Sequence, residues 1–169
     1  MLKPDHLRQH LVAALPQLAR DPEKLIVLAK DGNAVCTATG TLSFEYRYTL
    51  QIIVLDYAGH ADAIMVPLLA WIQRQQPELL DNSTLRERAV RFEVEYLTTD
   101  TVDIAIEIDL TERALVRARP GADPGALNII HPPEPTPVGW IEQAQRWRLY
   151  FRDDPEPIAE WSFDPRPLP

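Results

Sequence analysis

Residues 41–72 read TLSFEYRYTLQIIVLDYAGHADAIMVPLLAWI. From Leu42 to Val54 every even position is large and apolar or aromatic, whereas the odd positions from Ser43 to Gln51 are polar. A period of two predicts a β-strand with one buried face. About fifteen residues would span roughly 50 Å, which exceeds the roughly 40 Å expected across a compact chain of this size. We therefore expect the strand to bend, or to project past its own core toward a partner.

Helix and strand patterns on both sides of this segment complete the fold. Residues 56–62 read as a turn, and residues 63–75 as a helix with one apolar stripe. A first helix is predicted for residues 4–19, with Pro16 kinking or shortening its last turn. Strands are predicted for residues 24–30, 34–39, 90–96 and 102–110, and residues 112–119 add a strand or a helical turn. The result is an α+β fold: a largely antiparallel sheet with one long strand and two helices packed on one face.

Short connections and a single cysteine add detail. Asp31-Gly32-Asn33 predicts a tight turn between the first two strands. Residues 98–101 are expected to join the two later strands as an antiparallel hairpin. Cys36 is predicted to be a small buried side chain. As the sole cysteine it excludes an internal disulfide and fits a reducing cytosol.

The composition of the chain changes at Pro120. Residues 120–169 hold 11 of the 16 prolines and three of the four tryptophans. We therefore expect a core domain at residues 1–119 and a proline- and tryptophan-rich extension at residues 120–169. Within the extension, residues 146–163 are predicted to form a short β-hairpin. Trp140, Trp147 and Trp161 either cover the chain's own domain or reach a neighbouring subunit.

Charge and hydropathy exclude several classes of protein. The net charge of −8 and pI near 5.0 argue against a protein that wraps nucleic acid. The nearest approach to a basic patch is Arg113, Arg117 and Arg119. No apolar run approaches the roughly 20 residues of a membrane span, so no membrane partner is expected.

Catalytic motifs are absent from the sequence. It contains no glycine-rich nucleotide fingerprint, Walker loop, H-E-x-x-H, G-x-S-x-G or paired C-x-x-C. Asp56, His60 and Asp62 are close enough in sequence to bind a divalent cation. The alternative is that Asp62 caps the helix and His60 lies exposed in the turn. We favour that alternative and expect no catalytic residues, no metal and no cofactor.

An acidic strand face is the second candidate feature. Residues 100–112 hold five carboxylates and no lysine or arginine. They alternate with apolar residues, a pattern typical of a solvated strand face. The sharper hypothesis is that Asp103, Glu107 and Asp109 line the channel of a ring and repel DNA that passes through it.

Aromatic residues on the long strand are the third candidate feature. Phe44, Tyr46 and Tyr48 lie on its apolar face. Tyrosine is common at interfaces because it buries a large area and keeps a polar tip. The same residues are also ordinary core residues of strands, so both a core and an interface role stay open.

Three segments follow one another along the chain: LSFEYRYTL (residues 42–50), an apolar continuation to Asp56, and a helix containing VPLLAWI (residues 66–72). In the order of these segments the sequence resembles the tail completion protein R (GpR) family of temperate contractile-tailed phages. The opening LKPDHLRQHLVAALPQLARDPEKL (residues 2–25) is similar to the family's opening. The resemblance implies a structural protein that caps the head-proximal end of the tail tube, stops polymerisation and prepares the tail for joining to the capsid.

The resemblance also implies partners and a location. We expect a homo-hexameric ring that contacts the tail tube protein and the sheath or head–tail connector proteins, with DNA passing through unbound. The protein would lie at the neck end of the virion tail, and in the host cytoplasm during assembly. Two alternatives stay open: a transient assembly adaptor or chaperone absent from the virion, and a small metal-dependent hydrolase.

Overall fold

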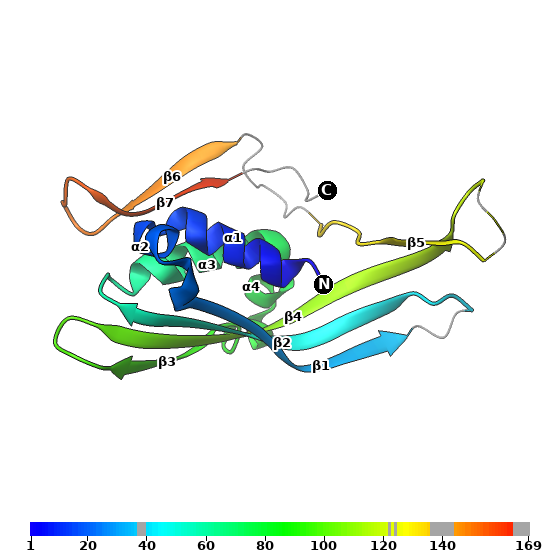
Figure 1. Cartoon of the computed structure of the whole chain (residues 1–169), viewed down its shortest axis with the longest axis horizontal. Coiled ribbons are helices and arrows are strands. Elements are labelled where there is room, and N and C mark those ends of the chain that lie inside the picture. Colours follow the sequence, from blue (N-terminus) through cyan, green and yellow to red (C-terminus); the bar gives the residue numbers. More distant parts are fainter. Residues whose placement is uncertain (37–39, 122, 124, 136–143, 164–169) are drawn as a thin grey trace.

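The computed structural model describes residues 1–36, 40–121, 123, 125–135 and 144–163 (Figure 1). Its main sheet is antiparallel throughout, with strand order β1 (Leu25–Cys36), β2 (Phe44–Tyr57), β4 (Val102–Ala118) and β3 (Arg91–Tyr96). A short strand, β5 (Leu127–Ile130), pairs with the far end of β4. Helices α1 (Lys3–Ala14) and α3 (Asp62–Gln75) lie together on one face of the sheet. The predicted α+β class with a largely antiparallel sheet and two helices on one face is confirmed.

The long strand β2 follows its sequence pattern. Tyr48, Leu50, Ile52 and Val54 are buried against the helices, and the odd residues between them are only partly covered. The alternation changes at a bulge where Asp56 adopts a positive φ of 48°. This extra residue turns Tyr57 into the core instead of away from it.

Two strand predictions are wrong in the same way. Residues 24–30 and 34–39 were expected to be separate strands, but β1 runs unbroken from Leu25 to Cys36. Asp31-Gly32-Asn33 forms a bulge within it, with Asp31 at a φ of 53°. Likewise β4 continues as a single strand to Ala118, so residues 112–119 form no separate element. In β1, pairing with the long strand β2 on both sides of the bulge overrides the local turn signal. In β4, pairing with β2 as far as Ala114 and with β5 from Leu115 continues the strand.

The position of Cys36 is also corrected. It lies at the end of β1 opposite Phe44, and its side chain is exposed instead of buried. The reason is that this end of β1 extends beyond the region that the helices cover.

The first helical segment divides at Pro16, as expected for a proline inside a helix. Leu15 is extended (φ −116°, ψ 112°), the conformation favoured before proline, and α2 (Pro16–Arg20) follows. A 3₁₀ turn (η1, Pro22–Lys24) leads into β1. Asp62 begins α3 without capping it, because no side-chain cap bond forms there. After α4 (Glu78–Asp81), Asn82 caps α5 (Ser83–Arg86) by accepting the backbone N–H groups of Thr84 and Leu85.

A third layer lies on the outer side of the helices. Strands β6 (Gln145–Tyr150) and β7 (Pro157–Phe163) form the predicted hairpin, and it packs across α1 and α3 (Figure 1). Ala159 and Trp161 join the main hydrophobic core from this side. The helices are therefore covered by the sheet below and by the hairpin above.

The far end of the sheet extends past the helical layer. The C-terminal end of β1, the N-terminal end of β2 and the β4–β5 pair all lie toward one end of the molecule (Figure 1). We call Arg113–Ile130 the β4–β5 arm, of which residues 122 and 124 lie outside the described residues. The expectation that the long strand projects past its core is met by this arrangement.

Candidate functional site

The predicted acidic face lies on the side of the sheet opposite the helices, and two of its carboxylates, Glu107 and Asp109, are paired with cations. Glu107 contacts Lys30 of β1 at 2.5 Å and Arg91 of β3 at 3.8 Å. Asp109 accepts two hydrogen bonds from Arg91, at 2.9 and 3.0 Å, and one from Thr49 at 2.7 Å. Asp103 has no cation beside it among the described residues, and its carboxylate accepts the backbone N–H of Asp56 at 2.8 Å.

These contacts shift the ionisation of the pair that faces β3. Hydrogen bonding to Arg91 holds the pKa of Asp109 below its usual value, and the same bond raises the pKa of Arg91. Both groups therefore stay charged across the physiological range. The sequence pattern of residues 100–112 missed the pairing because both cations come from other strands.

Phe44 and Tyr46 lie on β2 at the edge of the region of the sheet that the helices cover. Both are half-buried, and their rings meet edge to face with centroids 4.7 Å apart. On the same face of the sheet lie Val116, half-buried, and Leu127 and Ile129, which are 54% and 58% exposed. No described helix lies over this end of the sheet. We call Phe44, Tyr46, Val116, Leu127 and Ile129 the projecting apolar face.

Tyr48 and the tryptophans occupy different environments from Phe44 and Tyr46. Tyr48 is buried in the core, and its hydroxyl donates to Glu112 at 3.4 Å. Trp161 is 5% exposed, with Trp147 tilted against it at 5.9 Å between ring centroids. These three side chains contact their own chain. Trp140 lies outside the described residues, and an interface role for any of these aromatics stays a prediction.

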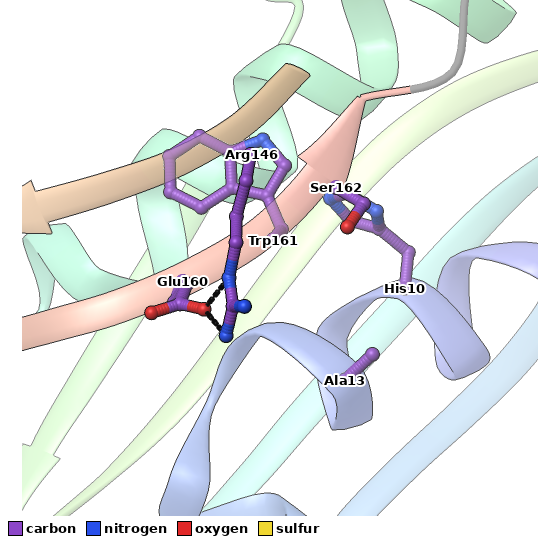
Figure 2. Close-up of a pocket in the computed structure, with 6 residues that line it drawn as sticks. All are labelled: His10, Ala13, Arg146, Glu160, Trp161 and Ser162. Carbon is purple, nitrogen blue, oxygen red and sulfur yellow. Dashed lines mark hydrogen bonds and ion pairs between the residues drawn. The ribbon is translucent and has the colours of Figure 1, made fainter. Parts of the chain in front are cut away.

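A small pocket lies between α1 and the C-terminal hairpin (Figure 2). Its volume is about 300 Å³, and it is lined by His10, Ala13, Arg146, Glu160, Trp161 and Ser162. Arg146 pairs with Glu160 across the two hairpin strands. His10 bonds the carbonyl oxygen of Pro67 at 3.0 Å. Burial lowers the pKa of His10 to about 4, so its imidazole is neutral at physiological pH.

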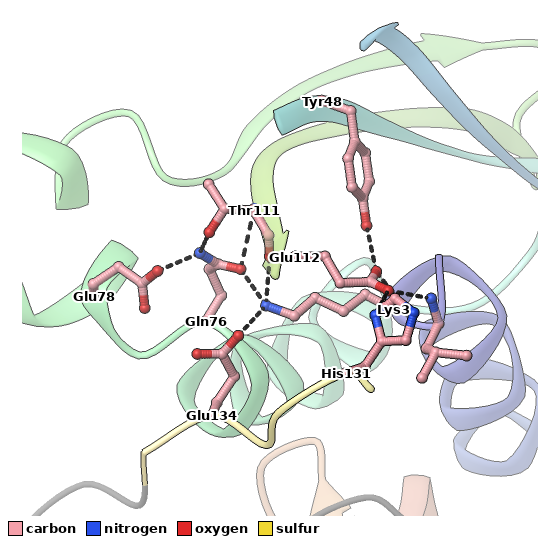
Figure 3. Close-up of polar contacts among 9 residues, drawn as sticks. Lys3, Tyr48, Gln76, Glu78, Thr111, Glu112, His131 and Glu134 are labelled. Carbon is pink, nitrogen blue, oxygen red and sulfur yellow. Dashed lines mark hydrogen bonds and ion pairs between the residues drawn. The ribbon is translucent and has the colours of Figure 1, made fainter. Parts of the chain in front are cut away.

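A buried polar network joins the start of α1 to β4 (Figure 3). Glu112 accepts the backbone N–H groups of Leu2 at 2.7 Å and Lys3 at 3.2 Å, and lies 3.1 Å from His131. A carboxylate at a helix N-terminus stabilises the unpaired N–H groups there. Glu112 was counted with the acidic face, but its even position places it with Ile108 and Leu110 on the buried side.

The same network closes an open stretch of strand edge. β3 pairs with β4 up to Glu107, and β5 pairs only from Leu115 onward. Between them, side chains satisfy the backbone of Thr111. The Thr111 N–H donates to Gln76 at 3.3 Å, and its carbonyl accepts from the Lys3 ammonium at 2.8 Å. Lys3 also pairs with Glu134 at 2.8 Å.

The turn at residues 56–62 does not assemble the suggested cation site. His60 contacts Asp62 at 3.2 Å, whereas Asp56 pairs with Lys24 at 3.6 Å. Across the described ranges, no three His, Cys, Asp or Glu side chains are grouped so that they could hold a metal ion. Within those ranges, no helix has the length and hydropathy needed to cross a bilayer.

Comparison with known proteins identifies relatives of this chain. The sequence profile of the family described as P2 phage tail completion protein R (GpR) matches residues 1–135. Tail completion protein R of Escherichia phage P2 is 38% identical over 138 residues, covering 82% of this chain and 88% of that protein. No solved structure matches. The chain therefore belongs to the P2 phage tail completion protein R (GpR) family.

Proposed function

We propose that this phage tail completion protein is a terminator that caps the head-proximal end of the tail tube. It stops tube polymerisation and prepares the tail to join the capsid. The observation that carries the proposal is the projecting apolar face, on which Leu127 and Ile129 are more than half exposed. A soluble monomer gains nothing from such a surface, whereas an assembly protein buries it against a partner.

The proposed assembly is a homo-hexameric ring that matches the tube. Each subunit contacts the next by heterologous surfaces, and the ring contacts tail tube protein on one side and sheath or head–tail connector proteins on the other. DNA passes through the ring without specific binding. The role needs surface complementarity and no catalytic step. The protein sits at the neck end of the virion tail, having assembled in the host cytoplasm.

Native mass of the full chain, alone and mixed with tail tube protein, tests this function. We expect a hexamer, or a monomer that becomes sixfold on tube ends, and tubes that stop growing once capped. Electron microscopy of tails made without the protein should show tubes of irregular length. A chain that ignores tube ends contradicts the proposal. Its absence from purified virions, with tail assembly still dependent on it, would instead identify a transient adaptor.

A further inference from the structure

The two ends of the molecule carry unpaired charges of opposite sign. Residues 113–130 contain three arginines and one aspartate, whereas residues 92–103 contain four carboxylates and no lysine or arginine. Arg113, Arg117 and Arg119 are exposed and make no ion pair within the described part of the chain. Glu93, Glu95 and Asp100 are also exposed and make no ion pair within the described part of the chain. We call Phe92–Asp103 the β3–β4 end.

These opposite charges cannot meet within one subunit. The arm and the β3–β4 end lie at opposite ends of β4, a strand of 17 residues. A strand of that length spans up to roughly 55 Å, several times the Debye length of about 8 Å at physiological ionic strength. The two sets of charges can therefore meet each other only between molecules.

Exposed apolar side chains accompany the charges at both ends. On β3, Phe92 is 61% and Tyr96 is 80% exposed, and both lie on the helix side of the sheet. On β5, Leu127 and Ile129 lie on the helix side as well. At each end the charged residues lie on the opposite side, with Glu93 and Glu95 on β3 and Arg113 and Arg117 on β4. The two surfaces are therefore opposite in charge. Each also carries its apolar side chains on the helix side of the sheet and its charged side chains on the other side.

We infer that the β4–β5 arm of one copy docks on the β3–β4 end of the next copy. Arg113, Arg117 and Arg119 meet Glu93, Glu95 and Asp100, while Leu127 and Ile129 pack near Phe92 and Tyr96. Such a head-to-tail contact is heterologous, and repeating it closes a ring when the rotation per copy is a whole fraction of a turn, as in a hexamer. The inference rests on the ring proposed above and identifies the surfaces that build it.

Charge reversal tests the contact directly. In the arm variant, Arg113, Arg117 and Arg119 are each replaced by Glu. In the end variant, Glu93, Glu95 and Asp100 are each replaced by Arg. Each variant alone places like charges across the contact, so we expect self-association at least roughly 100-fold weaker than in wild type. Sedimentation and native mass of the full chain, alone and on tube ends, measure it. Arg86→Glu with Arg88→Glu, exposed residues outside both surfaces, is the matched control.

A mixture of the two variants supplies the decisive readout. In an equal mixture, acidic arms meet basic ends and basic arms meet acidic ends, so rings of alternating composition should form. Recovery in the mixture also proves that both variants are folded. If wild type forms rings and neither variant associates more weakly, or if the mixture does not restore association, the contact is overturned. The proposal of a ring then still stands. Rings that obey the charge rule but leave tubes uncapped overturn the proposed function alone. A wild type that never associates overturns both.

Discussion

Glu112 of β4 lies 3.1 Å from His131, with the carboxylate almost completely buried beneath the first turn of α1. It accepts two backbone N–H groups and the hydroxyl of Tyr48. This carboxylate therefore joins α1, β2, β4 and the segment after β5.

Removing the Glu112 carboxylate should destabilise the fold. We expect Glu112→Ala to lower the free energy of unfolding by about 2–4 kcal/mol, because it leaves buried donors unsatisfied. Glu112→Gln keeps an acceptor and should cost less. Urea denaturation measures both, with exposed Glu156→Ala as control. A Glu112→Ala protein within about 0.5 kcal/mol of wild type would show that water replaces the carboxylate.

Gln76 should protect the open edge of β4. Its side chain accepts the Thr111 N–H and donates to the Thr111 hydroxyl at 3.0 Å. Replacing Gln76 with Ala should cost about 1–3 kcal/mol. It should also accelerate hydrogen exchange at the Thr111 amide more than at amides paired with β2. Exposed Gln73→Ala, in the last turn of α3 before Gln76, is the control, and equal exchange in both variants contradicts the assignment.

Acidification should destabilise the protein through His10. Burial lowers its pKa to about 4, whereas an unfolded imidazole titrates near 6.5. The unfolded state therefore binds more protons between these values, and stability present above pH 6.5 is lost as the pH falls toward 4. The loss is up to about 2–3 kcal/mol. Burial lowers the pKa of His6 too, which acts in the same direction.

Two variants isolate the contribution of His10. His10→Gln should flatten the pH dependence of unfolding, whereas exposed His60→Gln should not. Arg146 and Glu160 face His10 across the pocket, and their mutual ion pair is kept in both variants. A His10→Gln profile identical to wild type argues that protonation elsewhere controls acid stability.

Trp161 should hold the C-terminal hairpin on the helices. Truncation of this buried side chain by Trp161→Ala should cost about 3–5 kcal/mol. The hairpin should then be cleaved faster in limited proteolysis, while the main sheet resists. Tyr150→Ala, at a half-exposed position on the same hairpin, should change neither result by much.

Asp103 offers the cleanest test of the channel hypothesis, because Glu107 and Asp109 are already paired with cations. Asp103→Lys changes the charge by two per subunit and should slow DNA ejection from the phage that assemble. Because Asp103 also belongs to the β3–β4 end, the yield of assembled tails is measured alongside. Asp103→Asn removes the charge but keeps a side-chain oxygen that can accept the Asp56 N–H. It therefore separates the effect of the charge from the effect of losing this hydrogen bond. Ejection at the normal rate in the Lys variant would place Asp103 outside the channel.

Sequence reasoning succeeded where local pattern and tertiary pairing agree. The alternation along β2 predicted which side chains are buried, from Tyr48 to Val54. Successive side chains of a strand point to opposite faces, so an alternating sequence shows directly which face is buried. Pro16 divided the first helical segment where expected. The prediction failed at Asp31-Gly32-Asn33, where a turn signal lies inside a strand that pairs with β2 on both sides of a bulge. Long-range pairing is not encoded in a local window.

The candidate surfaces were predictable only in part. The carboxylates of residues 100–112 were visible in the sequence, but their partners Lys30 and Arg91 depend on strand order and register. Glu112 was the missed residue, although its parity with Leu110 and Ile108 was a usable signal. Placing Trp161 over α1 and α3 required the three-layer packing, which proline-rich composition alone does not specify.

The unbroken course of β4 has a mechanical consequence. Ala118 at the arm and Val102 at the opposite end belong to one strand, which β2 accompanies along most of its length. A pull applied between the two ends acts along the backbone of a strand that is already close to fully extended, so the strand has little slack to give. A subunit held at both ends within an assembled tail would thus behave as a stiff tie, with no loop in its line of tension.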